Sequence, residues 1–421
     1  MANHAPDPLV SVTSRWDRPA VATGPGETWL VVTVATAIPE SDTPRPPVDV
    51  AFVIDRSGSM SGLPLQLAKE GVLTALDQLN DEDGFSVVAY DDVPLTISRP
   101  ARATGKQRTM LAMTLAGLEP GGSTNLFGGW DLGCQHLMHP EFRVNGRVRR
   151  AILLTDGLAN VGLIDSARIA QEVSARRAVG ISTSTLGLGT GIDEAKLSAM
   201  AEAGGGSFAW VEHARDLPGF FARELNEAIS TVASGATITL TLPAGVRGRL
   251  LNPFPGERIG KRITVSLGEL PAGITIPLVF SITTRATDEG RFPPLALAAK
   301  WQEVNAAAAE LIDVPVDPLM AVRPADFDSM PRDEQAATAA ARMIADDAQR
   351  QAMRHYRSGD VSMARQALGS AARFAASAPA GAGIASELDE MMAYDPSSPE
   401  FQLLRRKIES DAHRRSRGRD V

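Results

Sequence analysis

The chain has 421 residues, of which 44% are hydrophobic and 22% are charged, and its formal net charge is −8. A chain of this length can form two or three domains with separate cores, and the composition is that of an ordinary globular protein. The acidic balance argues against a nucleic-acid-binding surface over the body of the protein. We therefore expect several domains and no specific nucleic-acid partner.

Three further features concern the cellular location. No stretch approaches the roughly 18 to 20 apolar residues that a membrane span needs, and residues 1–8 lack the basic flank and apolar segment of a signal peptide. The single cysteine, Cys134, allows no internal disulfide and is expected to be a small core residue on a helix. These features predict a cytoplasmic protein without a membrane span.

Residues 1–45 contain two strand-like runs, at 9–13 and 29–34, separated by a turn-rich segment at 22–26. Two strands have no core of their own and are marginally stable in isolation. We therefore expect an N-terminal β-hairpin that joins a sheet formed elsewhere in the chain.

Residues 46–234 alternate between strand and helix patterns. The strand patterns lie at 48–54, 85–90, 95–98, 151–154, 181–186 and 207–211, and the helical patterns at 63–79, 104–118, 126–138, 166–178, 193–203 and 218–233. This alternation predicts an α/β domain with a doubly wound, mostly parallel sheet. The glycine-rich segment 187–191 lacks the lysine and the spacing of phosphate-binding loops, so we interpret it as a plain strand-to-helix turn.

Oxygen-bearing side chains gather at the ends of these segments. Asp55, Ser57 and Ser59 follow the first strand pattern, Thr124 precedes the third helical pattern, and Asp156 follows the strand pattern at 151–154. The carboxyl ends of strands are where open α/β sheets bind ligands. Oxygen donors are the ligands that hard divalent cations such as Mg²⁺ prefer. We therefore predict a metal site made of these five residues.

Only two of the five candidate ligands carry charge. If either acid acts through water, the ion stays poorly neutralised and attracts an acidic group from outside. The run Asp55 to Ser59 alone is a weak signal, because Asp, Ser and Gly are common in turns. The three segments in order carry the prediction, which names Mg²⁺ as the ion and leaves Mn²⁺ and Ca²⁺ open.

The same five residues closely resemble the metal-ion-dependent adhesion site of the von Willebrand factor A (vWA) family. That site is written D-x-S-x-S, then a distant Thr, then a distant Asp, and Asp55, Ser57, Ser59, Thr124 and Asp156 meet it without substitution. The resemblance implies a Rossmann-like fold in which the hydroxyls coordinate or orient the ion and the aspartates bind it directly or through water. It also implies that an Asp or Glu of a partner protein fills the open position.

After residue 234 the hydrophobic pattern changes to period two. Runs at 236–242, 263–267, 274–282 and 295–301, with Gly and Pro between them, predict a β-sandwich over residues 235–325. The N-terminal hairpin is the obvious source of further strands. The vWA-like domain is therefore expected to be inserted in, or flanked by, this sandwich.

Residues 326–421 form an alanine-rich helical region with patterns at 334–358, 361–377 and 384–392. Gly359 and Asp360 suit the end of one helix and the start of the next, so we expect a helical hairpin that caps the sandwich. A basic tail follows, which we interpret as a solvated helix end favoured by the helix dipole. Its basic residues are Arg405, Arg406, Lys407, Arg414, Arg415, Arg417 and Arg419.

Catalysis has little support in the sequence. The six histidines are scattered, and none is paired with an acid or a nucleophile in a recognised spacing. Cys134, His136 and His139 match no zinc-binding pattern. We therefore expect no enzyme. A metal-dependent hydrolase or phosphatase that uses Asp55 and Asp156 is the alternative. Such an enzyme would need more carboxylates, to hold a second metal ion, than these motifs provide.

Taken with the resemblance, these features predict a bacterial protein–protein interaction module that captures an acidic residue of a partner through Mg²⁺. Intracellular vWA proteins often serve as adaptors in multi-protein assemblies, so the resemblance favours an assembly such as one with an AAA+ ATPase. A component of a kinase-regulated stress-response system is a further alternative. The sequence leaves the partner, the process and the oligomeric state open.

Overall fold

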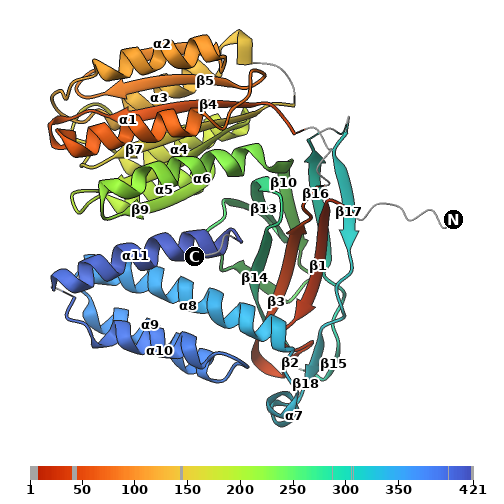
Figure 1. Cartoon of the computed structure of the whole chain (residues 1–421). Helices are drawn as coiled ribbons and strands as arrows, with labels where there is room; N and C mark the ends of the chain where they lie inside the picture. The colour runs from red at the N-terminus through yellow and green to blue at the C-terminus, as the bar shows by residue number, and fades with distance from the viewer. Residues whose placement is uncertain are drawn as a thin grey trace.

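The computed structural model describes residues 8–39, 45–142, 146–286, 288–304, 306, 308–396 and 398–418. In this part of the chain, Figure 1 shows an α/β unit, a β-sandwich and a group of helices. The α/β fold predicted from the alternating patterns, with its accompanying sandwich and C-terminal helices, is confirmed. The domain boundaries at residues 45, 234 and 325 stay predictions.

The α/β unit contains a six-stranded sheet in the order β6-β5-β4-β7-β8-β9. Its strands are β4 (Val48–Asp55), β5 (Gly84–Tyr90), β6 (Leu95–Arg102), β7 (Val148–Thr155), β8 (Ile181–Leu188) and β9 (Gly205–Val211). All neighbouring pairs are parallel except β5 and β6. Every residue of β4 is buried, which explains why residues 50–54 are a continuous apolar run and not an alternating one.

Helices cover both faces of this sheet. α1 (Leu63–Leu76), α2 (Gly105–Ala116) and α6 (Leu217–Ile229) pack on one face, and α3 (Leu126–Leu137), α4 (Ser166–Ala178) and α5 (Glu194–Gly204) pack on the other. Cys134 is buried on α3, as predicted. The helix expected at 218–233 ends earlier, because β10 begins at Thr231 and pairs there with Pro271.

The sandwich consists of two antiparallel sheets around one apolar core. The first has the order β1-β3-β14-β11, from β1 (Val10–Trp16), β3 (Gly24–Thr36), β14 (Thr275–Ala286) and β11 (Val246–Leu250). The second has the order β12-β13-β10-β16-β17, from β12 (Gly256–Ile259), β13 (Arg262–Pro271), β10 (Thr231–Thr241), β16 (Ala296–Glu303) and β17 (Glu310–Val314). A small sheet joins β15 (Gly290–Arg291), β18 (Met320–Val322) and β2 (Ala20–Ala22).

Strand β3 pairs with β14 from Gly24 to Ala35, so the N-terminal strands belong to the sandwich. The α/β unit leaves the sandwich after β3 and returns to it at β10. The turn expected at 22–26 is shorter than predicted, because β3 already begins at Gly24. The glycines have another role there: a Cβ on Gly26 would lie 2.7 Å from the carbonyl oxygen of Ala22, so glycine allows β2 to approach β3 closely.

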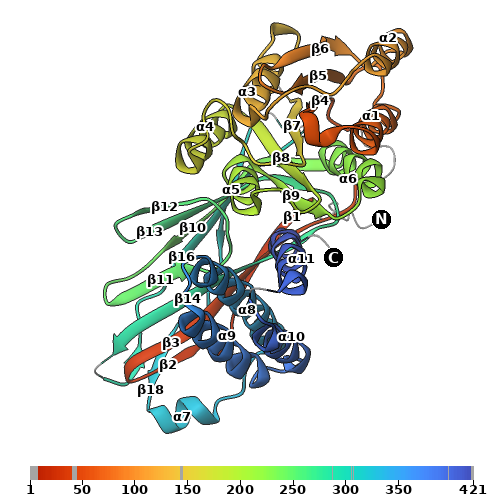
Figure 2. The ribbon, with the colours of Figure 1, turned by 90° about the vertical axis from the view of Figure 1, so that its left-hand side faces the viewer.

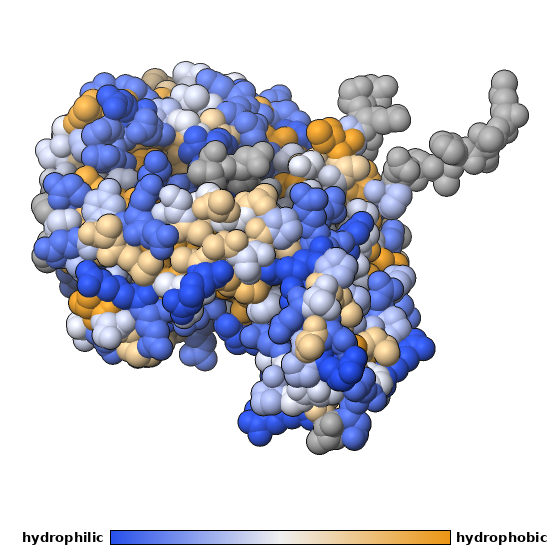
Figure 3. All heavy atoms as spheres, turned by 90° about the horizontal axis from the view of Figure 1, so that it is seen from below, coloured by the Kyte–Doolittle hydropathy of each residue, from blue (hydrophilic) through white to orange (hydrophobic). Residues whose placement is uncertain are grey.

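The helical region contains α7 (Pro324–Ser329), α8 (Glu334–Arg357), α9 (Val361–Ala376), α10 (Ala382–Ala393) and α11 (Pro399–Ser416). α8 packs its Ala336, Ala340 and Met343 against Val31 and Val279 of the first sandwich sheet. In the view of Figure 2 the helices α8 to α11 lie together on one side of the sandwich. Hydrophilic side chains cover most of the face in Figure 3. None of the helices described is long and apolar enough to cross a membrane.

The interpretation of the basic tail as a solvated helix end is wrong. Figure 1 shows α11 between α8 and the α/β unit, and Arg406 and Arg417 are only 8% and 5% exposed. Arg405 and Arg406 both donate to the Glu194 carboxylate at the start of α5. Arg417 donates to the carbonyl oxygen of Gly205 over 3.0 Å. These arginines therefore attach α11 to the edge of the α/β unit; Arg419 lies outside the described residues.

Candidate functional site

Two of the predicted site residues stand at the ends of adjacent parallel strands. Asp55 is the last residue of β4, and Asp156 directly follows β7. The two strands pair in parallel up to Ile54 and Leu154, so both acids reach the same edge of the sheet. This is the placement that the sequence predicted for them.

The two serines connect these acids. The chain turns after β4 into a short 3₁₀ helix, Gly58–Met60, and the backbone N–H of Ser57 donates to Asp55 Oδ1 over 2.8 Å. The hydroxyl oxygens of Ser57 and Ser59 are 3.1 Å apart. The Ser59 hydroxyl donates to Asp156 Oδ1 over 2.7 Å. A continuous chain of polar contacts thus links the loop after β4 to the end of β7.

Thr124 reaches the same place from the loop before α3. Its backbone N–H donates to the Asn160 side-chain oxygen over 2.8 Å, which ties this loop to the loop after β7. A Cβ on Gly157 would lie 3.8 Å from the Thr124 hydroxyl and 3.7 Å from the Ser59 hydroxyl. Both hydroxyls therefore face Gly157, and all five predicted residues meet at one edge of the sheet.

Burial dominates the electrostatics of this site. Burial raises the pKa of Asp55 to about 6, although hydrogen bonds to Ser57 and Thr155 lower it and the nearby Asp156 raises it further. Burial also raises the pKa of Asp156, against the hydrogen bond from Ser59. A cation between the two carboxylates would favour their ionised forms, so the site has an electrostatic reason to take one.

Several supporting residues escaped the sequence reasoning. The Thr155 hydroxyl donates to Asp55 Oδ2 over 2.7 Å, so both oxygens of that carboxylate are held. Asp91 forms an ion pair of 2.6 Å with Arg56, and Asp92 accepts a hydrogen bond from the backbone N–H of Ser123. Only the position of Thr155, directly before Asp156, gives a sequence signal for its role. The roles of Asp91 and Asp92 depend on how the loops pack.

The donor set fits a hard divalent cation. Two carboxylates and three hydroxyls offer oxygen only, which suits Mg²⁺, Mn²⁺ or Ca²⁺ better than a soft metal. Among the described residues, no group of three or more His, Cys, Asp and Glu side chains is placed to hold a metal ion. At the edge of the sheet, the hydroxyls of Ser57, Ser59 and Thr124 would therefore have to complete the coordination.

The surroundings of the site are partly apolar. Leu63 at the start of α1 is 60% exposed, and Leu158 in the loop after β7 is 57% exposed. A hollow of about 500 Å³ adjoins Asp156, and its wall includes Leu63, His213 and Arg215. Leu63 and Leu158 thus place exposed apolar side chains beside the polar centre of the site.

Comparisons with known proteins agree with this geometry. Residues 49–223 match the family model of the von Willebrand factor type A domain. The Escherichia coli protein with the name "Uncharacterized protein YfbK" is 25% identical over 297 residues, which are 65% of this chain and 51% of YfbK. Human inter-alpha-trypsin inhibitor heavy chain H4 is 32% identical over 168 residues, which are 38% of this chain and 18% of H4. The chain thus spans about half of YfbK and under a fifth of H4.

Solved structures are similar over nearly the whole chain. The structure of a von Willebrand factor type A protein from Catenulispora acidiphila has a TM-score of 0.73 at 18% identity, covering 97% of this chain and 98% of that one. The ArnB paralog VWA2 from Sulfolobus acidocaldarius has a TM-score of 0.65 at 16% identity, covering 97% and 99%. At these identities the likeness is one of fold, and it includes the sandwich and the helices.

Proposed function

Residues 49–223 form a von Willebrand factor type A domain, and from this premise we propose that the protein binds a partner protein through a divalent cation. vWA domains typically mediate protein–protein interactions. Here the cation would be Mg²⁺, with Mn²⁺ and Ca²⁺ as alternatives, and its ligands would be Asp55, Ser57, Ser59, Thr124 and Asp156. The partner would present an Asp or Glu side chain to it.

The observation that carries this proposal is the contact chain from Asp55 through Ser57 and Ser59 to Asp156. It places hydroxyl and carboxylate oxygens from two strand ends within hydrogen-bonding reach of one another. Pre-organised donors lose little conformational entropy when they bind an ion. The bound ion supplies a positive charge that attracts the carboxylate of the partner.

The residues of the site have different roles in this proposal. Asp55 is fully buried and held at both oxygens, so it anchors the site. Asp156 is less buried and adjoins the hollow, so it faces the side from which a partner would approach. Leu63 and Leu158 offer apolar contact beside the acidic residue of the partner. The protein would act by binding and not by turnover.

We propose an adaptor role in a multi-protein assembly, such as one with an AAA+ ATPase, in the cytoplasm. The partner class comes from the resemblance to intracellular vWA proteins alone.

Affinity capture from native lysate tests the proposal. Wild type and Asp55→Ala are each used with Mg²⁺ and with chelator, and Asp81→Ala, which removes an exposed carboxylate elsewhere, is the matched control. We expect at least one protein to be retained by wild type and by Asp81→Ala in Mg²⁺ only. Retention of the same proteins under every condition would contradict metal-dependent binding.

An enzymatic alternative gives a different result. A metal-dependent hydrolase or phosphatase would turn over a phosphate ester, and Asp156→Ala would abolish that turnover. Purified wild type, Asp156→Ala and Asp81→Ala are therefore assayed with a general phosphomonoester in Mg²⁺. We expect no turnover above the uncatalysed rate for any of the three.

A further inference from the structure

A second hollow of about 500 Å³ lies where the three units of the chain meet. Its wall comes from α5 of the α/β unit, from residues 249–253 of the sandwich, and from α8 and α11 of the helical region. Ligand sites occur preferentially at such junctions between domains. A small molecule bound here would contact all three units at once.

Positive charge gathers in this hollow. The charged side chains of its wall, histidine aside, are Arg249, Arg350, Arg354, Arg357, Asp347 and Glu202. Four arginines thus face two carboxylates, although the chain as a whole has a net charge of −8. A concave surface with an excess of one charge concentrates ligands of the opposite charge.

Asp347 positions two of the arginines. Its Oδ2 accepts a hydrogen bond from Arg249 Nη1 over 3.1 Å, and its Oδ1 lies 3.4 Å from Arg350 Nη2. Arg350 Nη2 also donates to the carbonyl oxygen of Leu251 over 2.7 Å. Arg350 Nη1 is buried and has no hydrogen-bond partner in the described part of the chain. A buried donor without an acceptor raises the free energy of the folded state. An anion that accepts a hydrogen bond from this guanidinium would remove that penalty.

The arginines of α8 form one stripe. Arg350, Arg354 and Arg357 are spaced four and three residues apart, so they share a face of the helix. Like charges at this spacing repel each other. The helix dipole explains cations in the last turn, where Arg354 and Arg357 lie. It does not explain Arg350, two turns from the end, or Arg249, which comes from the sandwich.

We propose that this hollow binds a small anion with two or more phosphate groups, such as pyrophosphate or a nucleoside diphosphate. Guanidinium groups match phosphate oxygens with paired hydrogen bonds, and several of them can neutralise several phosphates. Asp347 holds Arg249 and Arg350 in place before the ligand arrives. Because the ligand contacts three units, its binding also stabilises their arrangement.

Calorimetric titration of the full chain with pyrophosphate tests this site. The buffer has low ionic strength and no divalent cation, so that phosphate cannot bind through a metal ion at Asp55 and Asp156. We expect saturable binding of one pyrophosphate per chain. Arg354→Gln should weaken it about tenfold, the value of one charge-assisted hydrogen bond. Arg373→Gln, an exposed arginine of α9 outside the hollow, makes the same charge change and should leave the affinity unchanged.

Two further measurements sharpen the result. Arg249→Gln should also weaken binding, because it removes a guanidinium that the sandwich contributes. ADP bound more tightly than pyrophosphate would identify nucleoside diphosphates as the ligand class, and equal affinities would identify the diphosphate group alone. Absence of saturable binding by either probe would overturn the proposal. Equal weakening by Arg354→Gln and Arg373→Gln would do so too, since it would show a general effect of charge.

Discussion

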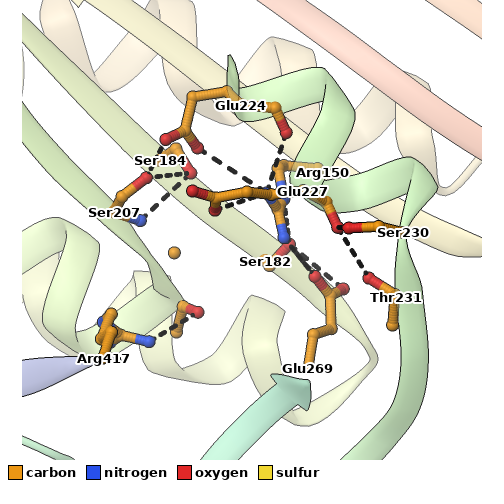
Figure 4. A network of polar contacts seen from close by, with 12 residues as sticks. Arg150, Ser182, Ser184, Ser207, Glu224, Glu227, Ser230, Thr231, Glu269 and Arg417 are labelled. Carbon is orange, nitrogen blue, oxygen red and sulfur yellow. Dashed lines mark hydrogen bonds and ion pairs between the residues drawn. The ribbon is translucent and has the colours of Figure 1, made fainter. Parts of the chain in front are cut away.

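Arg150 of β7 and Glu269 of β13 form an ion pair of 2.6 Å that crosses from the vWA domain to the sandwich. Figure 4 shows Glu224 and Glu227 of α6 beside the same guanidinium, at 3.7 and 3.8 Å from Arg150 Nη1. Arg150 is only 1% exposed. A buried charge must be paired, so this arginine joins β7, α6 and the sandwich in one polar cluster.

Replacement of Arg150 by alanine should therefore destabilise the protein strongly. The change leaves Glu224, Glu227 and Glu269 close together without their shared cation, and breaking a buried pair in this way costs about 3–5 kcal/mol. Urea unfolding measures the effect. Arg247→Ala, which removes an exposed arginine of β11, is the control and should change stability by less than about 0.5 kcal/mol. Similar losses in both variants would show that the cluster has no special role.

Metal affinity should fall in mild acid. Burial raises the pKa of Asp55 to about 6, and a proton on this carboxylate competes with the cation. With one competing proton, Mg²⁺ binding at pH 5 should be about tenfold weaker than at pH 7.5. Titrations at a series of pH values measure this. An unperturbed aspartate would give a constant affinity over the same range, which would contradict the assignment of Asp55.

The metal-free protein should show the opposite trend in stability. The folded state holds a proton on Asp55 more tightly than the unfolded state does, because the folded pKa is raised. This acid therefore destabilises the fold when it is ionised, and the penalty is relieved as the pH falls through about 6. Asp55→Asn should stabilise the metal-free protein at pH 7.5 and remove the stabilisation by Mg²⁺, as thermal unfolding with and without Mg²⁺ would show. A variant that still gains stability from Mg²⁺ would place the ion elsewhere.

The sequence predicted where the two acids lie better than it predicted the residues around them. Asp55 and Asp156 could be placed together because parallel strands of a doubly wound sheet end at one edge, which is a rule of topology. Thr155 was missed although it directly precedes Asp156 and contacts Asp55 from the neighbouring strand. Asp91 could not be assigned, since its partner Arg56 is reached only when the loops pack. The sequence pattern predicts the position of a residue in a strand, helix or loop. Tertiary packing determines which residues its side chain contacts.

The basic tail is a second case in which the sequence did not predict the tertiary contacts of a side chain. A cluster of arginines near a helix end has a local explanation in the helix dipole, and that explanation predicted a solvated terminus. The structure instead places Arg406 and Arg417 against the vWA domain, where Glu194 and the carbonyl oxygen of Gly205 accept their hydrogen bonds. Long arginine side chains can be buried along their stems when their ends find acceptors. No local pattern in the last 20 residues identifies those acceptors.

Glu194 should accordingly control the docking of α11. Glu194→Gln keeps the shape of the side chain but removes the charge that Arg405 and Arg406 share, so the end of the chain should detach more often. Hydrogen exchange of residues 400–416 should become at least about tenfold faster, which corresponds to about 1.4 kcal/mol. Glu390→Gln, an exposed acid of α10, is the control and should leave this exchange unchanged. Equal exchange in both variants would show that α11 is held by other contacts.

The glycine at position 121 should be needed for metal binding although it offers no side chain. A Cβ at Gly121 would overlap the Asp91 carboxylate, which pairs with Arg56 next to the loop after β4. Gly121→Ala must therefore displace Asp91 or the loop before α3, which contains residue 121, at a cost of about 1–3 kcal/mol in folding free energy. The displacement would move Thr124, three residues away, and should weaken Mg²⁺ binding. Gly105→Ala, where an added Cβ meets no atom within 4 Å, is the matched control and should bind Mg²⁺ like wild type. Equal Mg²⁺ affinity in the two variants, measured by titration, would show that the loop before Thr124 does not shape the site.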